Sequence, residues 1–361
     1  MQSIPYFIDT KVVIYYDMME IDFNLREENS FMANIQQVAA LAGVSVATVS
    51  RVINQYKNVS PETRTKVEQA IKQLNYEPNL IGRSLRTSQS RLLLVLIPSI
   101  SNPFYSEIIN GIEHIAIQQN YQILLCDTDS DAERERIYFD LLRKRMADGI
   151  ISMDPAVHID TLNQLSENHP IVQCSEYAPD SHIPYVTIDN EKAAYQAVKH
   201  LIHSGHKKIA LINSDMTYLY ARERERGYKK AIEEHGLTVD TDLTFYTSSL
   251  SFDQGRQAMK KIFQADTKPS AIFAVSDVLA IGALKEITNH KLRVPEDIAL
   301  VGFDKIEFSN MTNPALTTVA QPMHKMGVTA AKMLIDIIQG KTVDSIKLDH
   351  ELVLRESTLG S

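Results

Sequence analysis

Residues 34–54 decide the fold of the amino-terminal region, and they read NIQQVAALAGVSVATVSRVIN. The apolar residues that follow Asn34 recur at the i, i+3, i+4, i+7 spacing of one buried helix face, and Asn34 can cap that helix. Gly43 accepts the left-handed conformation of a tight turn, and Ser45 can cap a second helix directly after it. Two short helices joined by so brief a turn predict a helix-turn-helix motif.

The second helix has an outward face whose composition fits the major groove of DNA. Val49 and Val52 should point into the core. Small apolar groups can contact thymine methyls, a guanidinium can make a bidentate contact to guanine, and short polar groups can hold phosphates or base edges. The predicted DNA contacts are Ser45, Val46, Ala47, Ser50, Arg51 and Asn54. The alternative is a small helical domain whose outward face is merely solvated.

A third helix and the local charge support the DNA interpretation. Ser60 can cap this helix, Pro61 suits its first turn, and the apolar residues from Val67 to Leu74 form its core stripe. Residues 32–90 carry seven basic and three acidic side chains, a net charge of +4, whereas the whole chain has a net charge of −8. A basic region on an acidic body is typical of a nucleic-acid-binding module attached to another domain.

The first 31 residues fit neither region. They carry two basic and six acidic groups and show no helical or strand period. We expect residues 1–31 to be a non-native extension ahead of a natural start at Met32, or, as the alternative, a disordered native segment.

The composition also limits the number of domains, the cellular location and the roles open to the two cysteines. At 361 residues and 44% hydrophobic content, the chain can form two or three domains. No apolar run approaches the roughly 20 residues that span a bilayer, and no export signal is evident, so we expect a cytoplasmic protein without a membrane partner. Cys126 and Cys174 are expected to be reduced core thiols, with no metal or cofactor bound.

After residue 90 the pattern changes to α/β. Short apolar runs such as RLLLVLIP, YQILLCD, GIISM, IVQCSE and YVTID alternate with helical stretches, and KIALIN, AIFAVSD and IALVGFD form a second series. Continuous apolar strands between helices predict parallel sheets covered on both faces, here in two similar subdomains. Open sheets of this kind bind ligands at the carboxyl ends of their strands, where polar or aromatic candidates stand at Phe104, Tyr105, Ser175, Glu176, Asp277 and Asp304. Singly, the acidic residues could be helix caps and the aromatic residues could be core.

The segment IQQVAALAGVSVATVSRVINQYKNVSPETRTKVEQAIKQLNYEPNLIGRSLR resembles the DNA-binding head and hinge of the lactose-repressor (LacI/GalR) family of transcription regulators. Later motifs in the same order include NPFYSEIINGIE, SGHKKIALI, FAVSDVLAIGALK, VPEDIALVGFD and PALTTVAQP. SEYAPD at 175–180 and Gly82 in the hinge look most like the cytidine-repressor branch of that family.

The resemblance implies a domain plan. It places the helix-turn-helix domain at 32–77, a hinge helix and linker at 78–90, and an effector-binding and dimerisation domain at 91–361. Three crossings would divide the last into a clamshell like that of periplasmic binding proteins, with about 91–190 plus 321–345 in one half and 191–320 plus 346–361 in the other. Leu85 matches the family's minor-groove wedge, although it could instead be a core residue.

The resemblance also implies effector contacts. Phe104, Tyr105, Arg224 and Asp304 match positions that commonly hold the effector, with Tyr220 and Leu250 as weaker matches. An arginine and an aspartate can grip hydroxyls while aromatic rings stack. A nucleoside such as cytidine is the first expectation and a carbohydrate the alternative. We expect a homodimeric repressor on a palindromic operator.

Two other classes of function fit the sequence less well. A transport binding protein would need export and would have no use for a basic DNA-reading head. An enzyme would need an activated group, but the motifs GxGxxG, GxxxxGK[ST], HExxH and GxSxG do not occur in the sequence. The sequence therefore favours a regulator over an enzyme.

Overall fold

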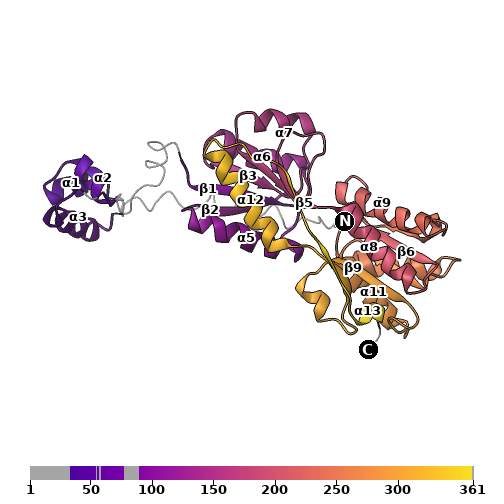
Figure 1. Ribbon diagram of the computed structural model, residues 1–361. Coiled ribbons are helices and arrows are strands. Elements are labelled where there is room, and N and C mark those ends of the chain that lie inside the picture. Colours follow the sequence, from indigo (N-terminus) through magenta and orange to yellow (C-terminus); the bar gives the residue numbers. More distant parts are fainter. Residues whose placement is uncertain (1–32, 54, 57, 77–88, 360–361) are drawn as a thin grey trace, which may run out of the picture. The chain divides into compact units, whose positions relative to one another are not determined.

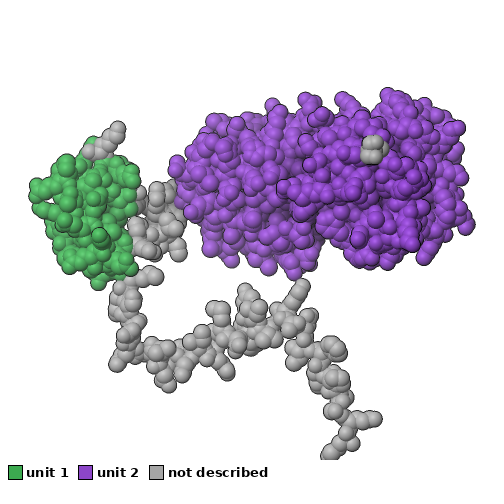
Figure 2. All heavy atoms as spheres, turned by 90° about the horizontal axis from the view of Figure 1, so that it is seen from below, with its two compact units in different colours: residues 1–86 green, residues 87–361 purple. Residues whose placement is uncertain are grey.

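The computed structural model describes residues 33–53, 55–56, 58–76 and 89–359. The chain divides into two compact units, within residues 1–86 and 87–361 (Figure 2). The predicted extension 1–31, Asn54, Leu85 and nearly all of the predicted hinge lie outside the described residues.

The first unit is a three-helix domain that contains the predicted helix-turn-helix. Its helices are α1 (Ile35–Ala42), α2 (Val46–Ile53) and α3 (Pro61–Gln73). Asn34 and Gln37 form a capping box at α1, because each side chain accepts a hydrogen bond from the other's backbone N–H, at 3.0 and 2.8 Å. Gly43 ends α1 in the left-handed conformation, with φ of 67°. The six residues buried between the helices are Val38, Ala39, Val49, Val52, Val67 and Ala70.

The second unit contains two six-stranded sheets (Figure 1). Sheet A has the order β11-β5-β4-β3-β1-β2, and all of its pairings are parallel. Its strands are β1 (Leu92–Ile97), β2 (Gln122–Asp127), β3 (Gly149–Ser152), β4 (Ile171–Cys174), β5 (Tyr185–Ile188) and β11 (Ile346–Leu348). Four helices cover its two faces, α5 (Phe104–Gln118) and α12 (Met323–Ile338) on one, α6 (Ala132–Arg143) and α7 (Ile159–Ser166) on the other. Sheet A with these helices is called the first subdomain.

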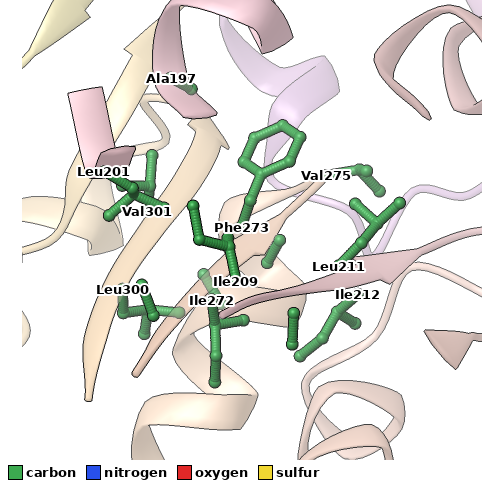
Figure 3. Packing of buried hydrophobic residues seen from close by; sticks show 14 of the residues in the cluster. Ala197, Leu201, Ile209, Leu211, Ile212, Ile272, Phe273, Val275, Leu300 and Val301 are labelled. Atoms are coloured by element: carbon green, nitrogen blue, oxygen red, sulfur yellow. The ribbon is translucent and has the colours of Figure 1, made fainter. Parts of the chain in front are cut away.

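Sheet B has the order β12-β10-β9-β8-β6-β7 and is parallel except for the antiparallel pair β10 and β12. Its strands are β6 (Ile209–Asn213), β7 (Thr244–Tyr246), β8 (Ala271–Ala274), β9 (Ala299–Asp304), β10 (Thr317–Ala320) and β12 (Glu351–Val353). Its helices are α8 (Asn190–His203), α9 (Leu219–Glu234), α10 (Phe252–Gln264), α11 (Asp277–Asn289) and the short α13 (Glu356–Leu359). Short 3₁₀ helices span Thr241–Leu243 and Glu307–Asn310. This second subdomain has one continuous core, part of which Figure 3 shows around Phe273, with Ala197 and Leu201 of α8 against strand residues such as Ile209 and Val301.

The clamshell of parallel sheets is confirmed, but one predicted subdomain boundary is wrong. The resemblance places residues 346–361 in the second subdomain, whereas Ile346 pairs with Val186 and Leu348 with Ile188 in sheet A. The reason is that β11 adds in parallel to the open edge of β5, and the chain crosses only afterwards, before Glu351 begins β12 in sheet B.

Close helix packing within the first subdomain depends on two glycines. A Cβ atom at Gly111 of α5 would lie 2.2 Å from the carbonyl oxygen of His324, and one at Gly327 of α12 would lie 1.9 Å from that of Ile108. The backbones of α5 and α12 therefore approach more closely than any larger residue allows.

Among the described helices, none is long and apolar enough by itself to cross a membrane. Taken as a pair, α1 and α2 pass the same length and hydropathy test, but they are bent by 102°.

Candidate functional site

The outward face of α2 presents the predicted DNA-contacting side chains. Val46 is 41% exposed, Ala47 and Arg51 are also exposed, and Ser50 is half-buried. Ser45 is exposed, and its hydroxyl accepts a hydrogen bond from the backbone N–H of Thr48 at 3.2 Å. These side chains share one face because Val49 and Val52 point into the core as predicted.

The two subdomains enclose a cavity of about 340 Å³ at the carboxyl ends of their strands. This volume is in the range of small-molecule sites. The predicted effector contacts that line it are Phe104, Tyr105, Ser175, Glu176, Tyr220, Arg224, Leu250 and Asp304. Residues from opposite subdomains, far apart in the sequence, thus meet around one space.

Arg224 is the cation of the cavity, and it is held from several sides. Its Nε donates to Asn190 Oδ1 at 3.0 Å, and its Nη1 donates to the carbonyl oxygen of Val275 and lies 3.6 Å from Asp304 Oδ1. The guanidinium carbon is 3.6 Å from the ring centroid of Phe303 and 5.0 Å from that of Tyr220. Burial lowers the pKa of Arg224, but an arginine stays charged in proteins.

Asp304 ends β9 in a conformation that L-residues rarely adopt, with φ of 113°. This backbone holds the carboxylate beside Arg224, where Oδ1 also accepts a hydrogen bond from Gln321 Nε2 at 2.8 Å. Burial raises the pKa of Asp304 to about 6, and the charge of Arg224 opposes that rise. Strained backbone at a cavity wall is typical of functional sites.

Asp277 is the predicted effector contact that the structure does not bring to the cavity. It is fully buried, and its carboxylate accepts hydrogen bonds from Thr318 Oγ1 at 2.6 Å and from the backbone N–H of Ile306 at 2.9 Å. Burial and then the neighbouring charge of Asp304 raise the pKa of Asp277. Asp277 follows strand β8 as predicted, but its carboxylate binds β10 and the loop after β9 and does not line the cavity.

Glu176 links the two subdomains. It follows β4 of the first subdomain, and its carboxylate accepts hydrogen bonds from the backbone N–H groups of Leu219 and of Tyr220, the latter at 3.1 Å. These groups begin α9 of the second subdomain, where Tyr218 at the N-cap position provides no side-chain cap. Burial raises the pKa of Glu176 to about 7, partly offset by these two hydrogen bonds.

Aromatic rings supply flat surfaces in the cavity. The rings of Tyr218 and Tyr220 are stacked with centroids 5.4 Å apart, whereas those of Phe104 and Tyr105 meet edge to face at 5.2 Å. Tyr218 also donates from its hydroxyl to Ser130 Oγ of the first subdomain at 3.0 Å. The cavity can therefore stack a planar group and bind hydroxyls at the same time.

Several lining residues were not predicted as contacts. The hydroxyl of Ser130 donates a hydrogen bond to the carboxylate of Asp154. Asp154 is 5% exposed, and its burial raises its pKa to about 6. Asp154 comes two residues after the end of β3, so the strand-end rule that found Ser175 and Glu176 could have found it. The serines after β7 and Tyr218 at the start of α9 carry no comparable signal.

These two units define a class of protein, a DNA-binding regulator whose second domain holds a small molecule. Residues 34–79 match the family model described as "Bacterial regulatory proteins, lacI family", and residues 90–356 match "Periplasmic binding proteins and sugar binding domain of LacI family". The chain belongs to the LacI family and is a DNA-binding transcriptional repressor of that family.

Relatives of known name span nearly the whole chain. Catabolite control protein A of Priestia megaterium is 38% identical over 90% of this chain and 98% of its own length. The HTH-type transcriptional repressor CytR of Escherichia coli K12 is 36% identical over 90% of this chain and 96% of its own length. The structure of the lac repressor dimer bound to operator and the anti-inducer ONPF matches with a TM-score of 0.82, at 30% identity, over 91% of this chain and 99% of that one.

Proposed function

We propose that this repressor acts in the cytoplasm as a homodimer on a palindromic operator, and that an effector in the cavity between its subdomains sets its operator affinity. A nucleoside such as cytidine is the first candidate for that effector. The observation that carries the proposal is the cavity that is lined by both subdomains and combines stacked rings with the pair Arg224 and Asp304. Ligands that bind the two arrangements of such a clamshell unequally shift the equilibrium between them.

The nucleoside candidate rests on the rings. Tyr218 and Tyr220 offer a stacked pair beside a half-buried Tyr105, which suits a planar base. A carbohydrate is the second candidate because eight serines line the same cavity and can bind several hydroxyl groups. The similarity to CytR, at 36% identity, adds support to the first.

The effector proposal is tested by thermal unfolding of the full chain with nucleosides, purine bases, monosaccharides and disaccharides. A ligand at 100 times its dissociation constant adds about 2.7 kcal/mol to the free energy of unfolding. We expect cytidine or another nucleoside to raise the melting temperature and to change operator affinity. A shift with sugars alone would replace the nucleoside by the carbohydrate and leave the cavity assignment standing.

The DNA side is tested separately with Arg51→Ala, using Lys72→Ala as the matched control. Both variants remove one exposed positive charge from the first unit, but only Arg51 lies on the outward face of α2. We expect Arg51→Ala to lose discrimination between operator and random DNA by about 1–3 kcal/mol, whereas Lys72→Ala retains it. Equal loss in both variants would argue against base reading by α2. We also propose that Asn54 and Leu85 contact the operator. Asn54 follows the outward face of the second helix in the sequence, and Leu85 matches the family's minor-groove wedge.

An exposed apolar edge supports the homodimer. Strand β2 is one of the two edge strands of sheet A, and its Leu124 and Leu125 are 43% and 39% exposed. Ile117 of α5 and Ile137 of α6, the helices next to this strand in the chain, are 65% and 63% exposed. Apolar edges of this kind are covered in stable proteins, and a second copy reading the other half-site provides the cover.

A binding role without turnover fits the state of the cavity carboxylates. Glu176 is held by the start of α9 and Asp304 by Arg224 and Gln321. We expect the effector to be recovered unchanged after prolonged incubation, as measured by chromatography.

A further inference from the structure

The charge that lines the cavity is strongly unbalanced. Among the described residues that line it, four carry carboxylates, namely Asp129, Asp154, Glu176 and Asp304, and one carries a guanidinium, namely Arg224. Arg224 is already engaged by Asn190, Val275 and Asp304, and its face is stacked on Phe303. A ligand anion would therefore meet several negative groups and a cation whose donors are largely used.

The start of α9 is the part of the cavity best suited to bind an anion, and the carboxylate of Glu176 already occupies it. Free backbone N–H groups at a helix N-terminus bind phosphates and carboxylates. Here the N–H groups of Leu219 and Tyr220 both donate to the Glu176 carboxylate, which reaches across from the other subdomain. An anionic ligand would have to displace a buried carboxylate to gain these donors.

Two other helices that begin at the cavity are also capped. The backbone N–H of Phe104 at the start of α5 donates to Asn102 Oδ1 at 3.1 Å. The N–H of Gln254 near the start of α10 donates to Ser251 Oγ at 3.2 Å. The hydroxyl groups around the cavity, in contrast, can turn to bind uncharged donors and acceptors.

We propose that the cavity admits an uncharged, polyhydroxylated effector and excludes its phosphorylated form, with Glu176 as the specificity-determining residue. The inference rests on the proposed effector function of this cavity and adds the charge of the ligand to it. Phosphorylation of the compound then removes it as an effector, so the repressor distinguishes a free nucleoside or sugar from its phosphate ester.

The experiment compares the wild-type full chain with Glu176→Ala and Glu176→Gln, with Glu223→Ala as the matched control. Glu176→Ala removes the charge and frees the α9 N–H groups, whereas Glu176→Gln removes the charge and keeps an acceptor oxygen. Glu223 lies on α9, the helix whose first N–H groups Glu176 binds; it pairs with Arg226 at 3.6 Å and is not among the residues that line the cavity. The probes are cytidine with cytidine 5′-monophosphate, glucose with glucose 6-phosphate, and inorganic phosphate against chloride at equal ionic strength.

We expect the uncharged member of a pair to bind the wild type about 100-fold more tightly than its phosphate, because like charges across an interface cost several kcal/mol. Glu176→Ala should narrow this ratio by about tenfold, Glu176→Gln by less, and Glu223→Ala should leave it unchanged. Equal binding of both members to the wild type, or tighter binding of the phosphate, overturns the proposal.

Inorganic phosphate tests whether Glu176 excludes anions even if no organic probe binds. Failure of all organic probes to bind would count against the effector candidates but not against the exclusion of anions. Saturable stabilisation of Glu176→Ala by phosphate, with none for the wild type, supports the role of Glu176. Saturable stabilisation of the wild type, or of neither protein, overturns it.

Discussion

Replacing Arg224 by methionine should destabilise the second unit in a way that depends on pH. Arg224 and Asp304 are 4% and 3% exposed, and their charged atoms are 3.6 Å apart. At an effective dielectric constant of about 20, two unit charges at this distance attract by about 4–5 kcal/mol. Methionine fills much of the volume of the side chain but leaves Asp304 buried without its cation. Breaking one side of such a pair costs about 3–5 kcal/mol.

The pH dependence follows from the pKa of Asp304. Burial already raises it to about 6, and Arg224 is the largest influence that lowers it. A carboxylate with a raised pKa binds more protons in the folded state, so wild-type stability falls as pH rises from about 4 to 6. Without Arg224 the pKa of Asp304 rises further, so the free energy of unfolding continues to fall up to a higher pH. The penalty of Arg224→Met should therefore be larger at pH 8 than at pH 5, where Asp304 is protonated.

The assay is urea unfolding of the wild type, Arg224→Met, Asp304→Asn and the double variant at pH 5 and pH 8. Asparagine keeps the oxygen that accepts from Gln321, so the double variant should cost about as much as either single change. The coupling energy should then equal the cost of one single change, about 3 kcal/mol or more at pH 8, and shrink at pH 5. A penalty below about 1 kcal/mol, or one that does not change with pH, would refute this reasoning.

Three further predictions concern other parts of the second unit. Gly327→Ala should cost about 1–3 kcal/mol in thermal unfolding, because its Cβ would lie 1.9 Å from the carbonyl oxygen of Ile108; an unchanged melting temperature would contradict the close packing of α5 and α12. Glu135 is fully buried, its Oε1 has no hydrogen-bond partner, and burial raises its pKa to about 7. Glu135→Gln should therefore gain stability relative to wild type as pH rises from about 4.5 to 7, by up to about 1.4 kcal/mol per pH unit, and the gain should level off at higher pH; a difference that stays constant over this range would count against it. Leu124→Lys on the edge strand should convert dimer to monomer in sedimentation and weaken operator binding, with exposed Lys229→Ala of α9 as a control.

Local signals in the sequence were enough for the first unit and for most strands. The cap at Asn34, the turn at Gly43 and the period of Val38, Val49 and Val67 are decided by neighbours within one or two helical turns. Each apolar run likewise marks a buried parallel strand by itself, and the rule that ligands meet strand ends then placed Ser175, Glu176 and Asp304 at the cavity.

Contacts between segments that are distant along the chain could not be predicted from the sequence. Asp277 obeys the same strand-end rule as Asp304, but Thr318 and Ile306 hold its carboxylate from behind the wall. Strand β11 has only three residues, and its sheet is decided by which edge is open once β5 is in place. The bond from Glu176 to α9 joins segments 43 residues apart, so no local pattern announces it.

The groups that build the cavity are also the groups that hold its two halves together. Glu176 accepts two N–H groups across the cleft, and Tyr218 donates across it to Ser130. Hydrogen bonds to charged groups contribute about 1.5–3 kcal/mol each, so the two bonds to Glu176 alone would favour the arrangement described here by several kcal/mol over one in which the two halves are apart. Coupling between two binding sites in allosteric proteins is commonly 1–3 kcal/mol. Under the proposed function, an effector that strengthens or replaces one cross-cleft bond would therefore alter operator affinity by about one to two orders of magnitude, and operator binding would change effector affinity by the same factor.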